Sequence, residues 1–467
     1  MEWPIVAPAP VVIEHAAVFR DLFDHQCQVR HFQPSLTGLI VLPNQSLANM
    51  ARCLLDSPDN TNLSRLRSEA PWRADELNRR RIRCMLQQTM PHRQRRRESL
   101  VVLDDTRCAH VGSLFDQVDR HDNHSDGTYP VAHNPVTSFS VSGPVRFPRG
   151  LRLYRRYEEL TQWAAAVAKH FPELKIPLDN KARNRLHQQV DPGLLQDPEC
   201  RARHEQFRTK IALAIDLVEE AIGRKVPCGV VVVDAWYLAE DVVQVLARRR
   251  KAWISLLNKN RLLETASFHL RDPQGWTLQW PGPHLAVEAL VPLLPANAYR
   301  PINVSEDTYW CFTLTVRIPG VGKVRSVVRC EHESLTGRSV VLVTNRVDWS
   351  AAKIIRLSWP RWPTDTFDPD SQGPLGFSEY RMRSAEAIGN QWCLVFVAYS
   401  LLHLTCLPAG PGRTWGLIHT MGDACRQQGR ALVQRLLIFV HDQLSQGAPI
   451  DHVFAQVFAT QRGSVPV

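Results

Sequence analysis

The feature that most constrains the fold of this chain is a run of four valines that ends in a carboxylate. Residues 229–237 read Gly-Val-Val-Val-Val-Asp-Ala-Trp-Tyr. Four successive β-branched residues are too few for a helix and are typical of a strand buried on both faces of a mostly parallel sheet. Ligands and metals gather at the carboxyl ends of the strands in open α/β sheets. Asp234 therefore stands where the chemistry of such a protein is usually done.

A second segment has the same pattern. Residues 99–106 read Ser-Leu-Val-Val-Leu-Asp-Asp-Thr, so an apolar strand again ends in acidic residues. Two buried strands that each present an aspartate at the tip predict one shared acidic site, which contains Asp104 and Asp234.

The charge of the chain is concentrated in one N-terminal region. The formal net charge is +10 and the pI is near 9.2. Between Arg65 and Arg97 eleven arginines face only three acidic residues. Such a concentration predicts a polyanion-binding surface. Charge alone leaves a second interpretation open, namely the solvated face of a helix.

The cysteines and the apolar runs bear on the compartment. Eleven cysteines, an odd number without a C-x-x-C pair, argue against a disulfide framework and against a structural zinc site. The N-terminus shows no basic segment followed by an apolar core, so we expect no secretory signal. The most apolar run, Cys393 to Leu402, is much shorter than the roughly 20 residues that span a bilayer. We therefore expect a soluble cytoplasmic protein in which this run is a buried helix.

Residues 1–98 are expected to form a helical, basic DNA-binding domain. Helical spacing over 45–55, a break, and a short helix over 62–67 would allow a helix-turn-helix arrangement. A third helix is predicted over 74–88, and a basic tether over 92–97 leads into the first strand. This third helix carries the predicted DNA-binding arginines Arg79, Arg80, Arg81 and Arg83.

From residue 99 the pattern changes to α/β. The Asp104 strand precedes two segments, 137–142 and 151–154, that alternate apolar with polar residues as antiparallel strands do. The polar loop 121–133 contains three histidines without regular ligand spacing, which favours a hairpin connection over a metal cluster. An amphipathic helix over 211–222, which we expect Gly223 to close, then leads to the Asp234 strand, a further helix and a strand over 253–257. That order of elements is the order of a ribonuclease H-like fold.

The predicted fold class is therefore α/β: a ribonuclease H-like mixed sheet with flanking helices, an all-β insertion and a helical N-terminal domain. The insertion is predicted from a convincing hairpin, 310–317 and 323–329 around the turn Pro319–Gly322, and from a strand over 339–344. The predicted domains are 1–98 (helical), 99–264 (first part of the catalytic core), 265–345 (insertion) and 346–467 (helices that complete the core).

These residues resemble the DDE transposases of bacterial insertion sequences, in the branch with a β insertion before the last catalytic carboxylate and a Tyr-x2-Arg-x3-Glu-x6-Lys signature. The resemblance covers about Leu42 to Leu407. It rests on the order and spacing of short pieces, since apolar strands ending in Asp occur in many α/β enzymes. These pieces are Val102–Thr106, Val233–Tyr237, Trp253–Leu257, Leu342–Asn345, Tyr380–Ile388 and the run Trp392–Leu404.

The resemblance implies three catalytic, metal-binding carboxylates. The first is Asp104, which forms an Asp-x-Thr pattern with Thr106, and Asp105 is the fallback. The second is Asp234. The third is Asp365, because the signature falls on Ser358, Arg361, Asp365 and Gln372, of which only Arg361 matches the family. Arg383 and Glu386, with Tyr380, are spaced one residue too closely for the signature and are interpreted as helix surface.

The resemblance also implies a function. Asp104, Asp234 and Asp365 would hold two Mg²⁺ ions, for which Mn²⁺ is expected to substitute, and Arg361 would grip a phosphate. The implied substrate is double-stranded DNA, both the terminal inverted repeats of an element and the target, with a dimer in the synaptic complex. The implied location is the nucleoid of a bacterial cytoplasm, without a membrane. Ser358, Asp365 and Gln372 depart from the signature, which leaves open an active enzyme, a decayed copy that binds DNA without cutting, or a nuclease of the same fold.

Overall fold

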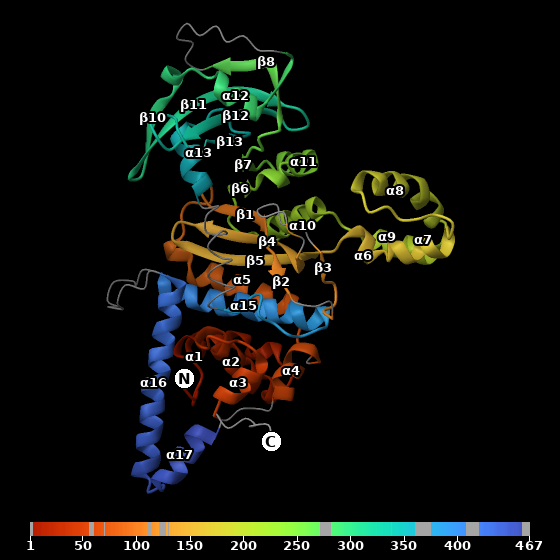
Figure 1. The fold of residues 1–467 in the computed structure, drawn as a ribbon. Coiled ribbons are helices and arrows are strands. Elements are labelled where there is room, and N and C mark those ends of the chain that lie inside the picture. The colour runs from red at the N-terminus through yellow and green to blue at the C-terminus, as the bar shows by residue number, and fades with distance from the viewer. Residues whose placement is uncertain are drawn as a thin grey trace.

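The chain is seen in a computed structural model. It describes residues 3–55, 60–69, 71–110, 114–120, 128, 130–270, 282–337, 339–359, 375–407 and 420–459. The molecule is elongated, with strands in its upper half and a layered sheet and helices below (Figure 1).

The centre of the molecule is a five-stranded arrangement in the order β5-β4-β1-β6-β7. β1 is antiparallel to β4, β4 is antiparallel to β5, and β1, β6 and β7 are parallel. This is the ribonuclease H-like order, so the predicted fold class is confirmed. The strands are β1 (Leu100–Asp105), β4 (Val131–Ser142), β5 (Val145–Tyr154), β6 (Val230–Val233) and β7 (Ala252–Leu256), with the short β2 (Cys108–Ala109) and β3 (Asp119–Arg120) on β4.

The β-rich segment continues the same sheet. β13 pairs antiparallel with β7, and β12, β11, β8 and β9 follow outward, so the thirteen strands within the described residues form one sheet. The predicted hairpin is β11 and β12, which pair from Trp310–Cys330 to Ile318–Gly322. The segment begins before residue 265, because β8 starts at Leu262. Its elements are β8 (Leu262–Leu270), β9 (His284–Ala286), α12 (Val287–Leu293), η4 (Ala296–Ala298), β10 (Arg300–Val304), β11 (Asp307–Ile318), β12 (Gly322–Cys330) and β13 (Val340–Thr344).

Alternation along the strands divides the core between two faces. In β1, Leu100 and Val102 belong to one apolar cluster and Val101 and Leu103 to the other. Side chains of a strand point alternately to opposite faces, so each face of the sheet is closed by its own layer of helices. The face with Val101 is covered by α10 (Lys210–Gly223) and α11 (Glu240–Arg248), and the other by α15 (Ala385–Cys406) with the N-terminal helices.

The N-terminal helices do not form a core of their own. Their apolar residues share one cluster with α15 and with one face of the central sheet. Two long-range hydrogen bonds fix this packing: Arg67 to Gln391 (2.7 Å) and Arg81 to Ser400 (2.7 Å). The boundary at residue 98 therefore separates two kinds of secondary structure within one packed body. The helices are α1 (Pro10–His15), η1 (Ala16–Leu22), α2 (Gln26–Val41), α3 (Leu47–Cys53), α4 (Asn60–Ser68), α5 (Ala74–Gln88) and η2 (Met90–His92).

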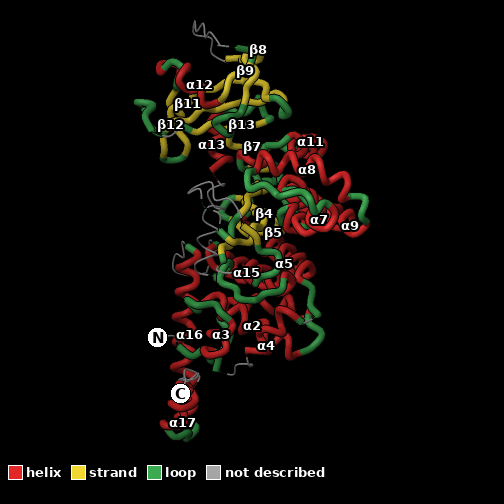
Figure 2. Tube along the Cα trace, turned by 45° about the vertical axis from the view of Figure 1, so that its right-hand side comes forward, coloured by secondary structure: helices red, strands yellow, loops and turns green. Residues whose placement is uncertain are grey.

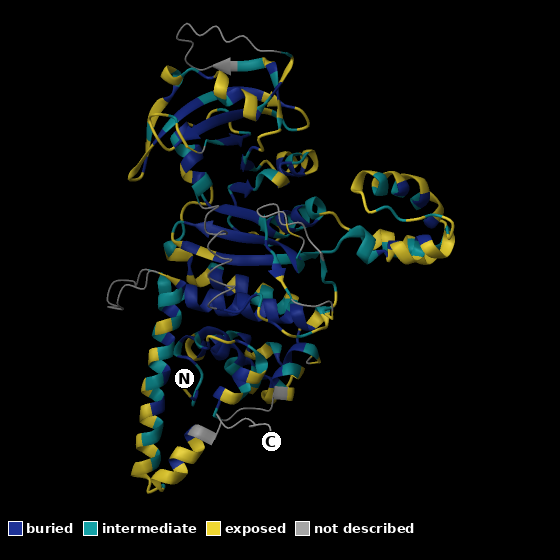
Figure 3. Cartoon of the chain, viewed as in Figure 1, coloured by how far each residue is buried: buried dark blue, intermediate teal, exposed yellow. Residues whose placement is uncertain are grey.

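α15 is the central helix of this body. Its length and mean hydropathy of 1.3 would suit a membrane span, but 89% of its apolar window is buried inside the protein. Figure 3 shows it as a buried layer between the sheet and the N-terminal helices. The prediction that the run 393–402 is a buried helix is confirmed.

Two helical extensions leave the body (Figures 1 and 2). Between β5 and α10 the chain forms an arm with a small core of its own around Trp163 and Val190. After α15, the long helix α16 (Met421–Ser445) runs along the N-terminal helices, and the short helix α17 (Ile450–Ala459) folds back. The arm consists of α6 (Tyr157–Leu160), α7 (Trp163–His170), α8 (Asn180–Leu194) and α9 (Pro198–Gln206). Two short elements complete the description: η3 (Ala235–Tyr237) follows β6, and α13 (Ala351–Ser358) follows β13.

Candidate active site

Asp104 and Asp234 stand at equivalent positions at the ends of the neighbouring strands β1 and β6. Leu103 of β1 pairs with Val233 of β6, so the two aspartates are the next residue along each strand. Val102 and Val232 point to the same face, and alternation places Asp104 and Asp234 on that face too. Neighbouring strands lie about 4.8 Å apart. The register thus places the half-buried Asp104 and Asp234 next to each other at one edge of the sheet.

Local hydrogen bonds hold these two residues. The Asp234 carboxylate caps the short helix η3 and accepts the backbone N–H of Trp236 (3.3 Å). The Asp104 carboxylate accepts the N–H of Asp105 (2.9 Å), and its carbonyl accepts the hydroxyl of Thr137 (3.2 Å). Both side chains are therefore oriented by the backbone that follows each strand.

Asp105 faces the other side of the sheet. Its carboxylate forms an ion pair with Lys210 Nζ (2.6 Å) and accepts the hydroxyl of Tyr237 (3.2 Å). With the Asn134 amide turned so that both its groups find partners, its nitrogen donates to the same carboxylate (3.0 Å) and its oxygen accepts from Lys210 Nζ (2.9 Å). Alternation makes Asp104 and not Asp105 the partner of Asp234. Asp105 instead ties β1 to α10 and η3.

Tyr237 lies within the field of all three carboxylates. Burial raises the pKa of its phenol, and the charge of Asp105, the charge of Asp104, the hydrogen bond to Asp105 and the charge of Asp234 raise that pKa further. The hydroxyl therefore stays protonated and donates to Asp105. The charges of all three carboxylates thus act on one phenol next to the strand tips.

Lys210 is the functional residue that inspection of the sequence missed. It is the first residue of α10, and its ammonium lies 5.4 Å from the ring centre of Tyr154 and 5.7 Å from that of Trp236. A cation at a helix N-terminus opposes the helix dipole, so it needs an anionic partner. That mismatch, a lysine directly after the capping Thr209, was the signal available in the sequence.

The predicted third carboxylate lies outside the described residues. Asp365, Arg361 and Gln372 all fall in the segment 360–374. Ser358 is the last residue of α13, where its hydroxyl donates to the carbonyl of Ile355 (2.8 Å). The metal-ligand role of Asp365 stays a prediction.

The interpretation of Tyr380 as helix surface is wrong, because the ring is only 4% exposed. Its hydroxyl lies 2.7 Å from His133 Nδ1, and its ring packs against Trp392. Glu386 is exposed in the first turn of α15. The start of α15 is tied to β4 through Asp116, whose carboxylate accepts the N–H of Ala385 (3.2 Å) and whose carbonyl lies 2.8 Å from His133 Nε2.

The four arginines of α5 do not form one exposed row. Arg79 pairs with Asp75 and Glu76, and Arg80 forms a two-pronged ion pair with Asp21 (2.9 Å). Arg81 is 1% exposed and burial lowers its pKa to about 9, so its side chain belongs to the interior and is not available to DNA. Of the four, Arg83 alone is exposed without an ion pair among the described residues.

One protein family matches the part of the chain that contains both aspartates. A family model described as DDE superfamily endonuclease matches residues 18–282, more than half of the chain, including both strand-end aspartates. The chain belongs to the DDE endonuclease superfamily. No curated protein matches it.

DDE endonucleases use divalent metal ions, and the side chains at the strand tips fit such ions. Asp104 and Asp234 offer carboxylate oxygens, the ligands that hard cations such as Mg²⁺ prefer. A bound ion would supply the Lewis acidity and charge neutralisation that phosphodiester cleavage needs. In this DDE endonuclease the two aspartates are the residues that would hold it, and Lys210 and Tyr237 would keep Asp105 from competing.

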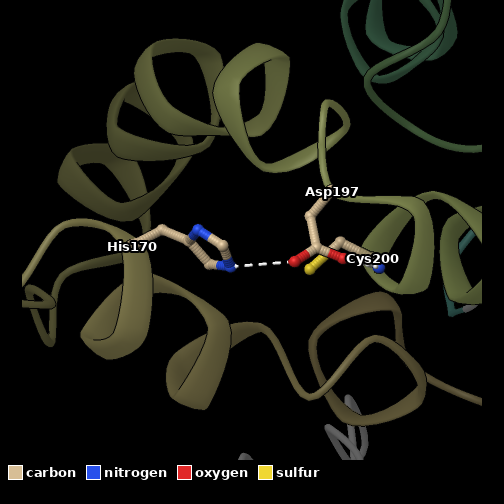
Figure 4. A group of neighbouring side chains, drawn as sticks. All are labelled: His170, Asp197 and Cys200. Atoms are coloured by element: carbon tan, nitrogen blue, oxygen red, sulfur yellow. Dashed lines mark hydrogen bonds and ion pairs between the residues drawn. The ribbon is translucent and has the colours of Figure 1, made fainter.

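A second group of potential ligands lies on the arm of the endonuclease, away from the sheet. The ligand atoms of His170, Asp197 and Cys200 lie within 4.8 Å of one another (Figure 4). The Asp197 carboxylate already accepts two N–H groups as the cap of α9 and pairs with His170 Nε2 (3.2 Å) and Lys169 Nζ (3.7 Å). Burial and the charge of Asp197 raise the pKa of the Cys200 thiol. The group is accounted for as an ionic cap that joins α7 to α9.

Proposed function

We propose that this DDE endonuclease is a transposase of a bacterial insertion sequence, which cleaves DNA at the element ends and joins them to target DNA. The observation that carries the proposal is the register of β1 and β6, which puts Asp104 and Asp234 side by side on one face. Two carboxylates on adjacent parallel strands form a rigid site for cations, and a phosphodiester substrate is anionic.

The residues of the chain would divide the work as follows. Asp104 and Asp234, with Asp365 as the third carboxylate, would hold two Mg²⁺ ions. Arg361 would bind a phosphate through its planar guanidinium, which matches phosphate geometry in two-point contacts. Lys210 and Tyr237 would hold the end of β1, and with it Asp104, in place. The proposed partners are terminal inverted repeats and target DNA, with two copies of the chain in the synaptic complex.

Two alternatives share the same site. One is a transposase-derived protein that binds DNA without cutting, favoured by the departures at Ser358, Asp365 and Gln372. The other is a nuclease that cuts without joining. Inverted repeats on both sides of the gene would favour the transposase over the nuclease.

The experiment is a nicking assay with duplexes that carry the DNA flanking the gene, in Mg²⁺, in Mn²⁺ and in EDTA. We expect weak metal-dependent nicking that Asp104→Asn and Asp234→Asn each abolish, while DNA binding is retained. Asp241→Asn, an exposed carboxylate in the first turn of α11, is the matched control and should leave nicking unchanged. Nicking that survives Asp234→Asn would overturn the proposed site.

A further inference from the structure

The three parallel strands of the central sheet begin at one edge, opposite the acidic site. The loops that precede β1, β6 and β7 therefore meet there. Gly229 N donates to the carbonyl of Ser99 (2.8 Å), and Lys251 Nζ donates to the carbonyl of Cys228 (2.7 Å). These contacts join all three loops into one continuous surface.

Each of the three loops is basic. Six exposed cations, which we call the basic edge, come from different parts of the chain, and none forms an ion pair among the described residues. Two acidic residues nearby are already engaged: Glu220 pairs with Arg224 and Arg152, and Glu219 pairs with Arg249. Glu98, which follows Arg97, is the acidic residue that remains in these loops, so cations outnumber it. The basic edge consists of Arg95, Arg96, Arg97, Lys225, Arg248 and Arg250.

Two of these cations occupy positions that favour glycine. Lys225 has φ 56° and Arg250 has φ 52°, both in the left-handed region. Each follows a helix that ends with the same paired bonds, Val226 N to Ala221 O after α10 and Lys251 N to Leu246 O after α11. Glycine is the usual residue at this point of such a helix end, because a side chain there is strained. Both loops therefore carry a cation at a position where glycine would be less strained.

We propose that the basic edge binds the phosphate backbone of double-stranded DNA, at a segment distinct from the cleaved phosphodiester. Leu100, the first residue of β1, lies four residues before Asp104, about 13 Å at about 3.3 Å per residue, and the basic edge lies beyond Leu100. One phosphodiester cannot occupy both ends of the strand. The proposal rests on DNA as the substrate but not on cleavage.

Duplex DNA fits this surface better than a small anion does. A duplex carries one negative charge per about 1.7 Å of axis, so cations spread over three loops can each meet a phosphate. No pocket or convergent set of donors is needed for such binding, since phosphate contacts position a duplex without reading its sequence. Exposed, unpaired guanidinium and ammonium groups on rigid strand connections supply that kind of contact.

The test removes charge while relieving backbone strain. Lys225→Gly and Arg250→Gly together place glycine at the two left-handed positions, so the variant should unfold at the same or a higher temperature than the natural chain. Binding is measured by fluorescence anisotropy with a 30-base-pair duplex of arbitrary sequence, in EDTA, over a series of KCl concentrations. We expect roughly tenfold weaker binding at low salt and a plot of log K against log[KCl] that is shallower by about 1–2. Adding Arg95→Gln, Arg96→Gln and Arg97→Gln to this variant should make the plot of log K against log[KCl] shallower still.

Two controls separate this role from others. The exchange of Lys225→Arg with Arg250→Lys keeps the charge and should keep the salt slope. Lys181→Gln with Arg185→Gln removes the same charge from exposed positions of α8 and should change the slope less. An unchanged slope in the glycine variant would overturn the proposal and leave the cations as partners of the helix dipoles or of an acidic protein. Because the assay contains no metal, failure of cleavage and failure of the basic edge are scored separately.

Discussion

At the scale of single residues, the site depends on Lys210, which neutralises Asp105 and not the adjacent Asp104. Asp104 and Asp105 are adjacent in sequence, and alternation in the strand and the position of Lys210 assign them different faces. The side chains of Lys210 and Asp105 are 17% and 26% exposed. An ion pair of that exposure contributes to stability mainly because either charge would be left unpaired without the other.

Replacing Lys210 should therefore affect fold and activity together. We expect Lys210→Met to lower the free energy of unfolding by about 1–3 kcal/mol, because Asp105 keeps its charge without its cation. Urea unfolding followed by circular dichroism measures the loss. The double variant Lys210→Met with Asp105→Asn should recover part of it. A double variant that is less stable than the single one would show that the ion pair is not the reason for the loss.

A buried histidine predicts how stability depends on pH. Burial, and next the charge of Arg146, lowers the pKa of His403 to about 4 from 6.5, and its Nε2 accepts the N–H of Arg146 (2.8 Å). The unfolded chain thus takes up the proton first as pH falls. The stabilisation is complete above about pH 6.5 and is lost between there and about pH 4, with a loss of about 2 kcal/mol from pH 7 to pH 5.

His403→Gln tests this, since glutamine can accept the same N–H and does not titrate. We expect the variant to lose less stability than the natural chain between pH 7 and pH 5 in urea unfolding. Burial also lowers the pKa of His110 to about 4. Both proteins contain this histidine, so both should still lose some stability as pH falls. Identical pH dependence in both proteins would contradict the assignment to His403.

At the scale of elements, the sequence predicted the central strands and the sheet order because their signals are local. Runs of β-branched residues and strand-end carboxylates mark β1 and β6, and alternation marks β4 and β5. Helix ends were harder. Gly223 was expected to close α10, yet it is the last helical residue, and the left-handed position falls on Lys225. The helix is closed by bonds from Lys225 N to Ile222 O and from Val226 N to Ala221 O, two residues later than the glycine suggests.

Gly229 is the element-scale residue on which the junction of β1 and β6 depends. A Cβ atom there would lie 2.3 Å from the carbonyl oxygen of Arg97, which is backbone and cannot turn aside. We expect Gly229→Ala to destabilise the protein by several kcal/mol, on the order of 2–4, and to separate the two strands that carry Asp104 and Asp234. Gly223→Ala is the matched control, because a Cβ there meets nothing within 4 Å and alanine favours a helix. The thermal unfolding temperature should fall for Gly229→Ala and rise for Gly223→Ala. Equal shifts of that temperature would contradict the packing argument.

At the scale of the whole molecule, contacts between distant segments decided what the sequence could not. Arg81 carries a charge and was expected at a DNA surface, but α15, more than 300 residues later in the chain, covers it. α16 likewise holds the N-terminal segment through Gln428 to Val11 N (3.1 Å) and Arg435 to the carbonyl of Pro8 (2.8 Å). Such burial depends on which helices meet, and a single sequence gives no signal for that. The positive region predicted for residues 65–97 is thus divided, with its interior arginines structural and its last three at the basic edge.

The last prediction concerns the complete catalytic set, which joins β1 and β6 to a residue beyond α13. Asp365 is shorter than glutamate by one carbon–carbon bond, about 1.5 Å, whereas metal coordination tolerates about 0.2 Å. We therefore expect the natural chain to nick cognate DNA ends poorly, and Asp365→Glu to raise Mg²⁺-dependent nicking if reach is the main defect.

The comparison needs three further variants measured in the same assay. If Pro360 and Pro363 distort the backbone instead, Asp365→Glu alone will do little, and recovery will also need Ser358→Tyr and Gln372→Lys. Robust nicking by the natural chain that Asp365→Ala abolishes would show that aspartate serves in place of glutamate. Robust nicking that survives Asp365→Ala would assign the third carboxylate elsewhere, and Glu386→Gln would then be the next variant to measure, because Glu386 is an exposed carboxylate in the first turn of α15.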